Sequence, residues 1–187
     1  SKAHWEKLLA GQEDPARSAD LVHQQAVAGT LARLATDDAI FTCDTGEVTV
    51  WGARHLHLRA GQRFTLSFNL ASMAYALPAE LGAQWTWRQR EGIALSGGGF
   101  FNTLMGDFLT AVKYALPIKV IVFNNGKLGL IQMEEEAEGL PEEETLLQNP
   151  DYVALALAMG GKGFRINRPD EIEAVLQLAL AEPGPVI

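Results

Sequence analysis

The chain has 187 residues, of which 48% are hydrophobic, and this length and composition are typical of one globular domain with a substantial core. Its 15 Lys and Arg against 23 Asp and Glu give a formal net charge of −8 without any basic cluster, which argues against nucleic acid as a partner. The single cysteine, Cys43, excludes an intramolecular disulfide, and the lack of a signal-peptide apolar region or a run of about 20 apolar residues predicts a cytoplasmic chain without a membrane span.

The first third of the chain predicts a connector, a helix and a strand. We interpret residues 1–17, with a short helix before a polar break, as an N-terminal connector to a single domain at residues 18–187. Apolar residues recur at helical spacing over residues 21–35, which predicts a helix with one buried face. Residues 39–43 then form an apolar run typical of a buried strand.

Glu47 follows this first strand and has two interpretations. It lies just beyond the carboxyl end of a strand, where functional side chains gather in parallel sheets, so it is a candidate functional carboxylate. It also stands where the next helix begins, and a carboxylate there is stabilised by the helix dipole. We favour this second interpretation.

The middle of the chain predicts a helix at 48–58, a strand at 63–68 and a helix at 72–84 with Pro78 near its start or at a kink. His55 and His57 are two residues apart and therefore point to different sides of the first of these helices. We expect both at the surface and no metal site between them.

The central stretch alternates strands with a helix. It reads as a strand at 92–95, a glycine turn at 96–99, a helix at 102–114, a strand at 118–123 and a polar end at 124–126. The rest of the chain adds further elements of both kinds: helices at 128–138, 149–159 and 169–180 and strands at 163–166 and 185–187.

This alternation of strands and helices with short connections is typical of an α/β fold. We predict three αβα layers, with an open, mostly parallel sheet of about six strands and helices on both faces.

Two loops of the central stretch should face one site, because both follow the carboxyl ends of strands. Gly97, Gly98 and Gly99 allow backbone N–H groups to approach an anion, and the following helix start favours negative charge, so this turn suits a phosphate or diphosphate. Asn124 and Asn125 offer neutral oxygens that suit a hard cation bridging phosphates.

The run LSGGGFFNTLMGDFLTAVKYALPIKVIVFNNGKLG, residues 95–129, resembles the thiamine diphosphate motif of the pyruvate oxidase branch, which also includes acetolactate synthases and related 2-oxo acid decarboxylases. That motif is Gly-Asp-Gly, a spacer and Asn-Asn. The resemblance extends from about residue 37 to the end of the chain and covers the C-terminal, diphosphate-binding domain of such enzymes.

The resemblance implies a set of binding residues for thiamine diphosphate and Mg²⁺. The side chain of Asn125 and the backbone carbonyl of Lys127 would bind the metal, and the glycine turn, Gly97 to Gly99, would contact the diphosphate. Met73 would support the bent cofactor, although Met is equally a good filler of irregular core gaps. The carbonyl of Ala71 would lie near the aminopyrimidine ring.

The sequence departs from the family pattern at this site. Gly98 stands where the family has its metal-binding Asp, and Mg²⁺ sites usually contain one or two carboxylates. Phe100 stands where the family has a small residue, and its ring competes for the space of the diphosphate. Leu70 and Ala71 replace the usual His-Gly.

Three functions remain open from the sequence. The first is the thiamine diphosphate-binding domain of a pyruvate oxidase-like decarboxylating enzyme, with impaired cofactor binding and no catalysis alone, because the Glu that activates the cofactor belongs to a separate pyrimidine-binding domain. The second is a non-catalytic domain, either degenerate or engineered as a scaffold. The third is the small subunit of a two-chain decarboxylase.

A lone domain of this family must cover or repack the face that normally meets the pyrimidine-binding domain. We expect such a partner domain or self-association, including a homo-oligomer, through Tyr75, Trp85, Trp87 and Phe100.

Overall fold

Four short strands form one parallel sheet in the computed structural model, which describes residues 2–187. The strand order is β2-β1-β3-β4, and each neighbouring pair is parallel. The strands are β1 (Ile40–Cys43), β2 (Arg63–Leu66), β3 (Gly92–Gly97) and β4 (Lys119–Phe123). All four carboxyl ends therefore lie at one edge of the sheet.

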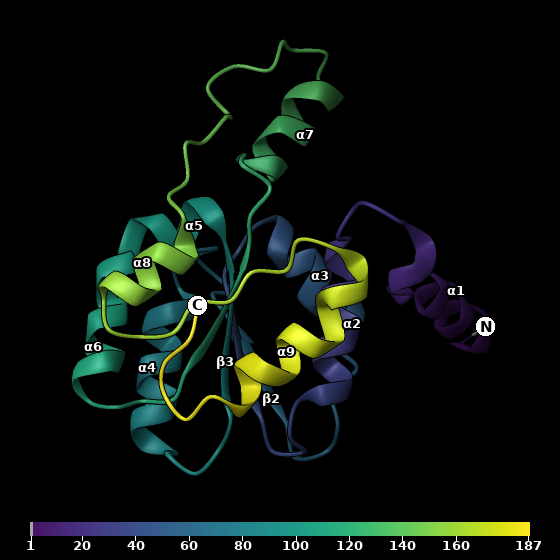
Figure 1. Cartoon of the computed structure of the whole chain (residues 1–187). Coiled ribbons are helices and arrows are strands. Elements are labelled where there is room, and N and C mark those ends of the chain that lie inside the picture. Colours follow the sequence, from purple (N-terminus) through teal and green to yellow (C-terminus); the bar gives the residue numbers. More distant parts are fainter. Residues whose placement is uncertain (1) are drawn as a thin grey trace.

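Helices cover both faces of this sheet and confirm the three-layer α/β fold (Figure 1). One face carries α4 (Ala76–Thr86), α5 (Gly98–Leu104), α6 (Phe108–Lys113) and α8 (Tyr152–Ala158). The other carries α2 (Gln24–Leu34), α3 (Glu47–His55) and α9 (Ile172–Ala181). Short 3₁₀ turns lie at Pro15–Arg17, Met105–Asp107 and Pro169–Glu171. No helix within residues 2–187 combines the length and apolar character needed to cross a bilayer.

The predicted number of about six strands is wrong, because the sheet has four. Val186 forms one isolated parallel bridge to Lys119 on one side and one to Lys162 on the other. The expected strands at 163–166 and 185–187 therefore lie beside β4 in the right order. Neither has the consecutive pairing that makes a strand.

Most predicted helices have somewhat different boundaries in the structure, and two of them begin four residues from the expected start. The helix expected at 102–114 begins at Gly98 and is divided by the Met105–Asp107 turn into α5 and α6. The helix expected at 72–84 begins at Ala76, which places Pro78 in its first turn, where a missing N–H costs no internal hydrogen bond.

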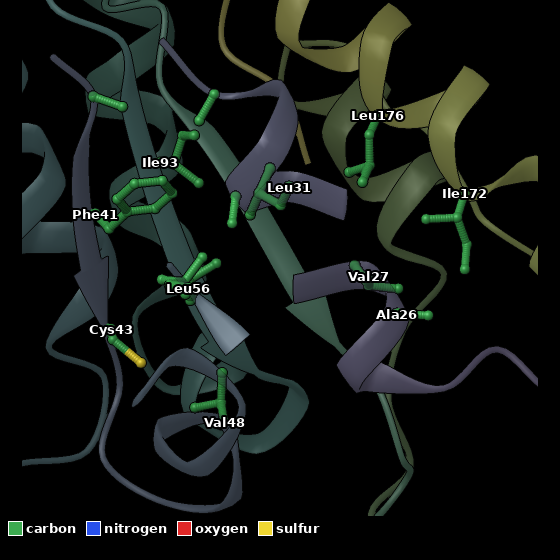
Figure 2. Packing of buried hydrophobic residues seen from close by; sticks show 14 of the residues in the cluster. Ala26, Val27, Leu31, Phe41, Cys43, Val48, Leu56, Ile93, Ile172 and Leu176 are labelled. Atoms are coloured by element: carbon green, nitrogen blue, oxygen red, sulfur yellow. The ribbon is translucent and has the colours of Figure 1, made fainter. Parts of the chain in front are cut away.

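The core between the sheet and the α2, α3, α9 layer is built from interlocking apolar side chains (Figure 2). Phe41 and Ile93 come from adjacent strands, Leu31 from α2, and Leu176 from α9, and all are buried. Cys43 belongs to the same cluster, and burial raises the pKa of its thiol to about 12. The thiol is therefore a small apolar core group at neutral pH.

The carboxylate of Glu13 connects the helix α1 (Lys2–Glu13) to the end of α3. Oε1 of Glu13 lies 2.9 Å from Nδ1 of His55 and 2.8 Å from Nε2 of His57. The expected surface position of His55 is wrong, because its side chain is fully buried under this contact, whereas His57 is exposed.

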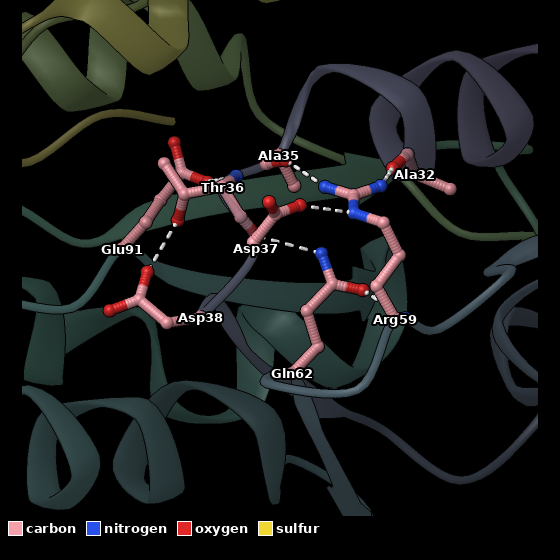
Figure 3. Close-up of polar contacts among 8 residues, drawn as sticks. All are labelled: Ala32, Ala35, Thr36, Asp37, Asp38, Arg59, Gln62 and Glu91. Carbon is pink, nitrogen blue, oxygen red and sulfur yellow. Dashed lines mark hydrogen bonds and ion pairs between the residues drawn. The ribbon is translucent and has the colours of Figure 1, made fainter.

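Arg59 closes the C-terminus of α2 at the edge of the sheet opposite the carboxyl ends (Figure 3). Its guanidinium donates to the carbonyls of Ala32 and Ala35, which no further turn of helix can satisfy, and to Oδ1 of Asp37 at 2.6 Å. Gln62 adds a bond of 2.7 Å to the carbonyl of Thr36. This edge is therefore held by charged and amide side chains bonded to backbone.

A buried carboxylate lies between α4 and the sheet. Oε2 of Glu80 accepts a 3.1 Å bond from Thr42, whereas its Oε1 and Oε1 of Gln84 are buried without a partner within residues 2–187. Both of these oxygens crowd Gly92, where an added Cβ would lie 2.3 and 2.4 Å from them. Burial raises the pKa of Glu80 to about 8, so the carboxyl is protonated at neutral pH.

Glu80 should make stability fall as pH rises. The folded chain holds this proton with a pKa of about 8, whereas an unfolded Glu has a pKa of about 4.3, so the contribution is complete below about pH 4.3 and is lost as pH rises through about 8. The slope approaches about 1.4 kcal/mol per pH unit between these values. Urea unfolding between pH 5 and 8 should therefore show a shallower pH dependence for Glu80→Gln than for the parent chain. Glu134→Gln, an exposed control, should keep the parent slope, and parallel curves for all three proteins would refute the assignment.

Candidate functional site

Loops that follow all four strands surround a cavity of about 110 Å³ at the carboxyl edge of the sheet. Most of the predicted binding residues line it: Met73, Gly97, Gly98, Gly99, Asn125 and Lys127. Glu47, the candidate carboxylate, lines it too. Ala71 does not. It lies in the loop after β2 with φ +50° and is exposed.

A larger cavity, of about 550 Å³, lies between β4, residues 164–166 and α9. Of the predicted binding residues it contains only Asn124. Its walls are mainly apolar side chains, and it is bounded by the last two residues, Val186 and Ile187. The chemistry predicted from the sequence therefore belongs to the smaller cavity.

Asp44 fixes the positions of three loops around the smaller cavity. Its carboxylate is fully buried, accepts a 2.8 Å bond from the backbone N–H of Ala76 at the start of α4, and accepts a second from the hydroxyl of Ser96 beside the glycine turn. Burial raises the pKa of Asp44, and these two hydrogen bonds oppose that rise. One side chain therefore ties together the ends of β1 and β3 and the start of α4.

The glycine turn is bordered at Gly98 by a chain of hydrogen-bonded amides. Nδ2 of Asn149 donates to Oδ1 of Asn124 at 2.7 Å, and Nδ2 of Asn102 donates to Oδ1 of Asn149 at 2.8 Å. The hydroxyl of Tyr152 donates to Asn102 at 3.0 Å and lies 3.2 Å from the carbonyl of Gly98. Burial raises the pKa of Tyr152 to about 12, which keeps this hydroxyl a donor.

This network occupies the space that the Cβ of a side chain at position 98 would need. A Cβ added to Gly98 would be 2.6 Å from Nδ2 of Asn149 and 3.3 Å from Oδ1 of Asn124. An Asp at this position would therefore require Asn149 to move. Sequence reasoning treated Asn149 only as a helix start and missed the network, because its hydrogen-bonded pairs are separated by 25 to 54 residues along the chain.

The ring of Phe100 lies against two glycines, Gly97 in the turn and Gly46 in the loop after β1. A Cβ on Gly97 would lie 2.9 Å from the ring, and one on Gly46 would lie 2.6 Å from it. Gly46 also has φ +151°, a conformation that other residues rarely adopt. The two glycines thus make the space that the phenyl ring fills.

Asn125 faces Glu47 across the cavity. Its Nδ2 donates a 2.7 Å bond to Oε2 of Glu47, and its Oδ1 accepts a 3.0 Å bond from the backbone N–H of Lys127. The side chain of Lys127 is paired with Glu142 at 3.3 Å. On either side of Lys127, the Leu128 N–H and the Gly126 carbonyl are bonded to Thr145 and Leu147.

Comparison with known proteins assigns the family. Residues 44–187 match the family described as thiamine pyrophosphate enzyme, C-terminal TPP binding domain; thiamine pyrophosphate is another name for thiamine diphosphate. The chain belongs to this family.

Its curated relatives are longer proteins. The chain is 38% identical over 184 residues to YdaP of Bacillus subtilis, which is named as a thiamine pyrophosphate-containing protein. It is 32% identical over 152 residues to the acetolactate synthase isozyme 2 large subunit of Escherichia coli and 31% identical over 170 residues to the mitochondrial acetolactate synthase catalytic subunit of Saccharomyces cerevisiae. These alignments cover 98%, 80% and 89% of the chain but only 32%, 28% and 25% of the relatives, so the chain spans about a third of their length or less.

The cavity, as this chain folds, does not fit the family's cofactor and metal. Its volume of about 110 Å³ is below the roughly 300 Å³ at which ligand pockets usually begin, and Phe100 fills space beside the turn. Gly98 supplies no carboxylate, and the oxygen of Asn125 is already bonded to Lys127. No group of three or more His, Cys, Asp or Glu in the described part of the chain is arranged to hold a metal ion.

Asp44→Ala should destabilise the chain by about 2–4 kcal/mol, because it removes two hydrogen bonds to a charged group. Ser96→Ala removes only one of them and should cost about 1–2 kcal/mol. Urea unfolding at pH 8 measures both values. Equal stability of the two variants would show that the bond to Ala76 contributes nothing.

Proposed function

We propose that this chain is the diphosphate-binding domain of a pyruvate oxidase-like 2-oxo acid decarboxylating enzyme, and that its own cofactor binding is impaired. The observation that carries the proposal is the cavity at the carboxyl edge, which gathers the glycine turn, Met73, Asn125 and Lys127. The pyruvate oxidase assignment rests on the motif in residues 95–129. When bound, thiamine diphosphate supplies the electron sink for decarboxylation.

In the intact site, each predicted residue would have a separate task. The backbone of Gly97 to Gly99 would contact the diphosphate, and the side chain of Asn125 and the carbonyl of Lys127 would bind Mg²⁺. Met73 would support the cofactor, and the carbonyl of Ala71 would lie near its aminopyrimidine ring.

Two substitutions account for the impairment. Gly98 leaves the metal without its charged ligand, and Mg²⁺ is usually held by one or two carboxylates together with phosphate oxygens. Phe100 places a ring over Gly97, where the diphosphate would need the backbone. We propose that catalysis further requires a pyrimidine-binding domain, because the resemblance implies that the Glu that activates the cofactor belongs to that separate domain.

Restoring both positions should restore binding. Calorimetric titration of thiamine diphosphate with Mg²⁺ should give no saturation at micromolar concentration for the parent chain, and at least about tenfold tighter binding for Gly98→Asp/Phe100→Gly, which corresponds to about 1.4 kcal/mol. Phe68→Gly is the matched control, because it removes an exposed ring outside the cavity lining. Micromolar saturation of the parent chain would contradict the proposed impairment.

The alternative, a non-catalytic domain that self-associates, is favoured by exposed aromatic residues. Trp85 and Trp87 are 56% and 54% exposed, and Trp85 meets Tyr114 edge-to-face at 5.1 Å. The other two residues of the predicted surface lie elsewhere. Phe100 packs at the cavity, and Tyr75 is half-buried and bonded to Thr65.

If this aromatic patch joins two copies, Trp85→Ser/Trp87→Ser should convert a dimer to a monomer, because the fully buried anchors of an interface are typically aromatic. Sedimentation equilibrium over a concentration series measures the mass. Leu70→Ser, which changes an exposed residue after β2, is the control and should leave the mass unchanged. A monomeric parent chain would remove this alternative.

A further inference from the structure

The charge of the small cavity is opposite to what a diphosphate requires. Glu47 is the only acidic residue in its lining, and Lys127 is the only basic one. Nζ of Lys127 lies 3.3 Å from Oε1 of Glu142, so its charge is already paired. Within residues 2–187 no basic side chain forms an ion pair with Glu47, and the cavity therefore keeps one uncompensated carboxylate.

The position of this carboxylate is well defined. Glu47 is the first residue of α3, and its Oε2 accepts the 2.7 Å bond from Asn125. The same oxygen lies against Gly129 at the start of α7 (Gly129–Ala137), where an added Cβ would be 2.3 Å from it. Two helix starts thus favour its negative charge. Its second oxygen, Oε1, has no hydrogen-bond partner within the described residues.

Apart from Gln24, Asn125 and Lys127, the other side chains that line the cavity are aromatic or apolar. Trp51 comes from α3, Met73 from the loop before α4 and Phe100 from α5, and Leu128 and Ile131 line the side formed by the start of α7. A diphosphate here would approach Glu47 as a like charge without a metal to separate them. A carboxylate among aromatic and apolar walls instead suits an organic cation, whose charge pairs with the carboxylate and the aromatic faces while its carbon atoms are removed from water.

We propose that this cavity binds a small organic cation, a short-chain primary alkylammonium, through the carboxylate of Glu47. The ammonium group would pair with Oε1, and the alkyl chain would lie against the apolar walls. The inference rests on the proposed function in one respect, namely that the same cavity no longer takes a diphosphate.

The probe is butylammonium, and its neutral counterpart is butanol, which has the same alkyl chain. Calorimetric or NMR titration of the parent chain should give a dissociation constant of about 1–5 mM for butylammonium, as expected for a ligand with so few non-hydrogen atoms. Butanol should bind at least about tenfold more weakly, and added salt should weaken only the ammonium.

Glu47→Gln keeps the size of the side chain and removes its charge. It should lower the affinity for butylammonium to that for butanol and leave butanol binding unchanged, which shows that the cavity is intact. Glu143→Gln, an exposed control on the loop after α7, should bind as the parent chain does. Chemical shift changes should centre on Glu47, Trp51 and Asn125.

Equal affinity of the parent chain for butylammonium and butanol would overturn the inference, as would unchanged ammonium binding by Glu47→Gln. The proposed function fails on a different result, micromolar binding of thiamine diphosphate with Mg²⁺ to the parent chain. The two titrations use the same protein and separate the two failures.

Discussion

The buried carboxylate of Asp44 is the interaction on which the arrangement of the site depends. It accepts hydrogen bonds from the start of α4 and from Ser96, and so holds the ends of β1 and β3 in fixed relation. Burying a carboxylate costs free energy unless the carboxylate is hydrogen-bonded. Loss of either donor would therefore destabilise the loops at this edge of the sheet. The glycine turn follows Ser96 directly, which means that its position is set by the same bond.

Around Asp44, hydrogen bonds between neutral amide side chains connect the loops that a metal ion and its carboxylate ligand connect in a charged site. The amides of Asn102, Asn124 and Asn149 connect the turn, the end of β4 and the start of α8 through hydrogen bonds of 2.7 and 2.8 Å. Such a network keeps the loops together without a cation, because each amide has both a donor and an acceptor to share. The remaining charge of the cavity then belongs to Glu47, on the opposite side of the turn.

The two edges of the sheet are stabilised differently. At the amino edge, the side chains of Arg59 and Gln62 donate hydrogen bonds to backbone carbonyls at the end of α2, and so connect the segment before β2 to that helix end. At the carboxyl edge, α7 has no buried residue and projects from the domain (Figure 1), held mainly by contacts of its first residues with Glu47 and the 126–147 pairing. The α7 segment beside the cavity therefore has little buried side-chain surface to hold it against the domain.

The sequence by itself determined the fold class and the family, because strand and helix periodicity, the glycine turn and the Asn pair are local patterns. It also predicted that the glycine turn and Asn125 face one site, since carboxyl ends of parallel strands share one edge, and the family resemblance added Met73 and Lys127 to that site. Only the tertiary structure decided that the sheet has four strands, that Phe100 lies over Gly46, and that Asn149 occupies the space beside Gly98. It also decided that His55 is buried and that Glu47 faces Asn125. These outcomes depend on contacts between residues far apart in the chain, and no local pattern specifies which long-range partner a side chain finds.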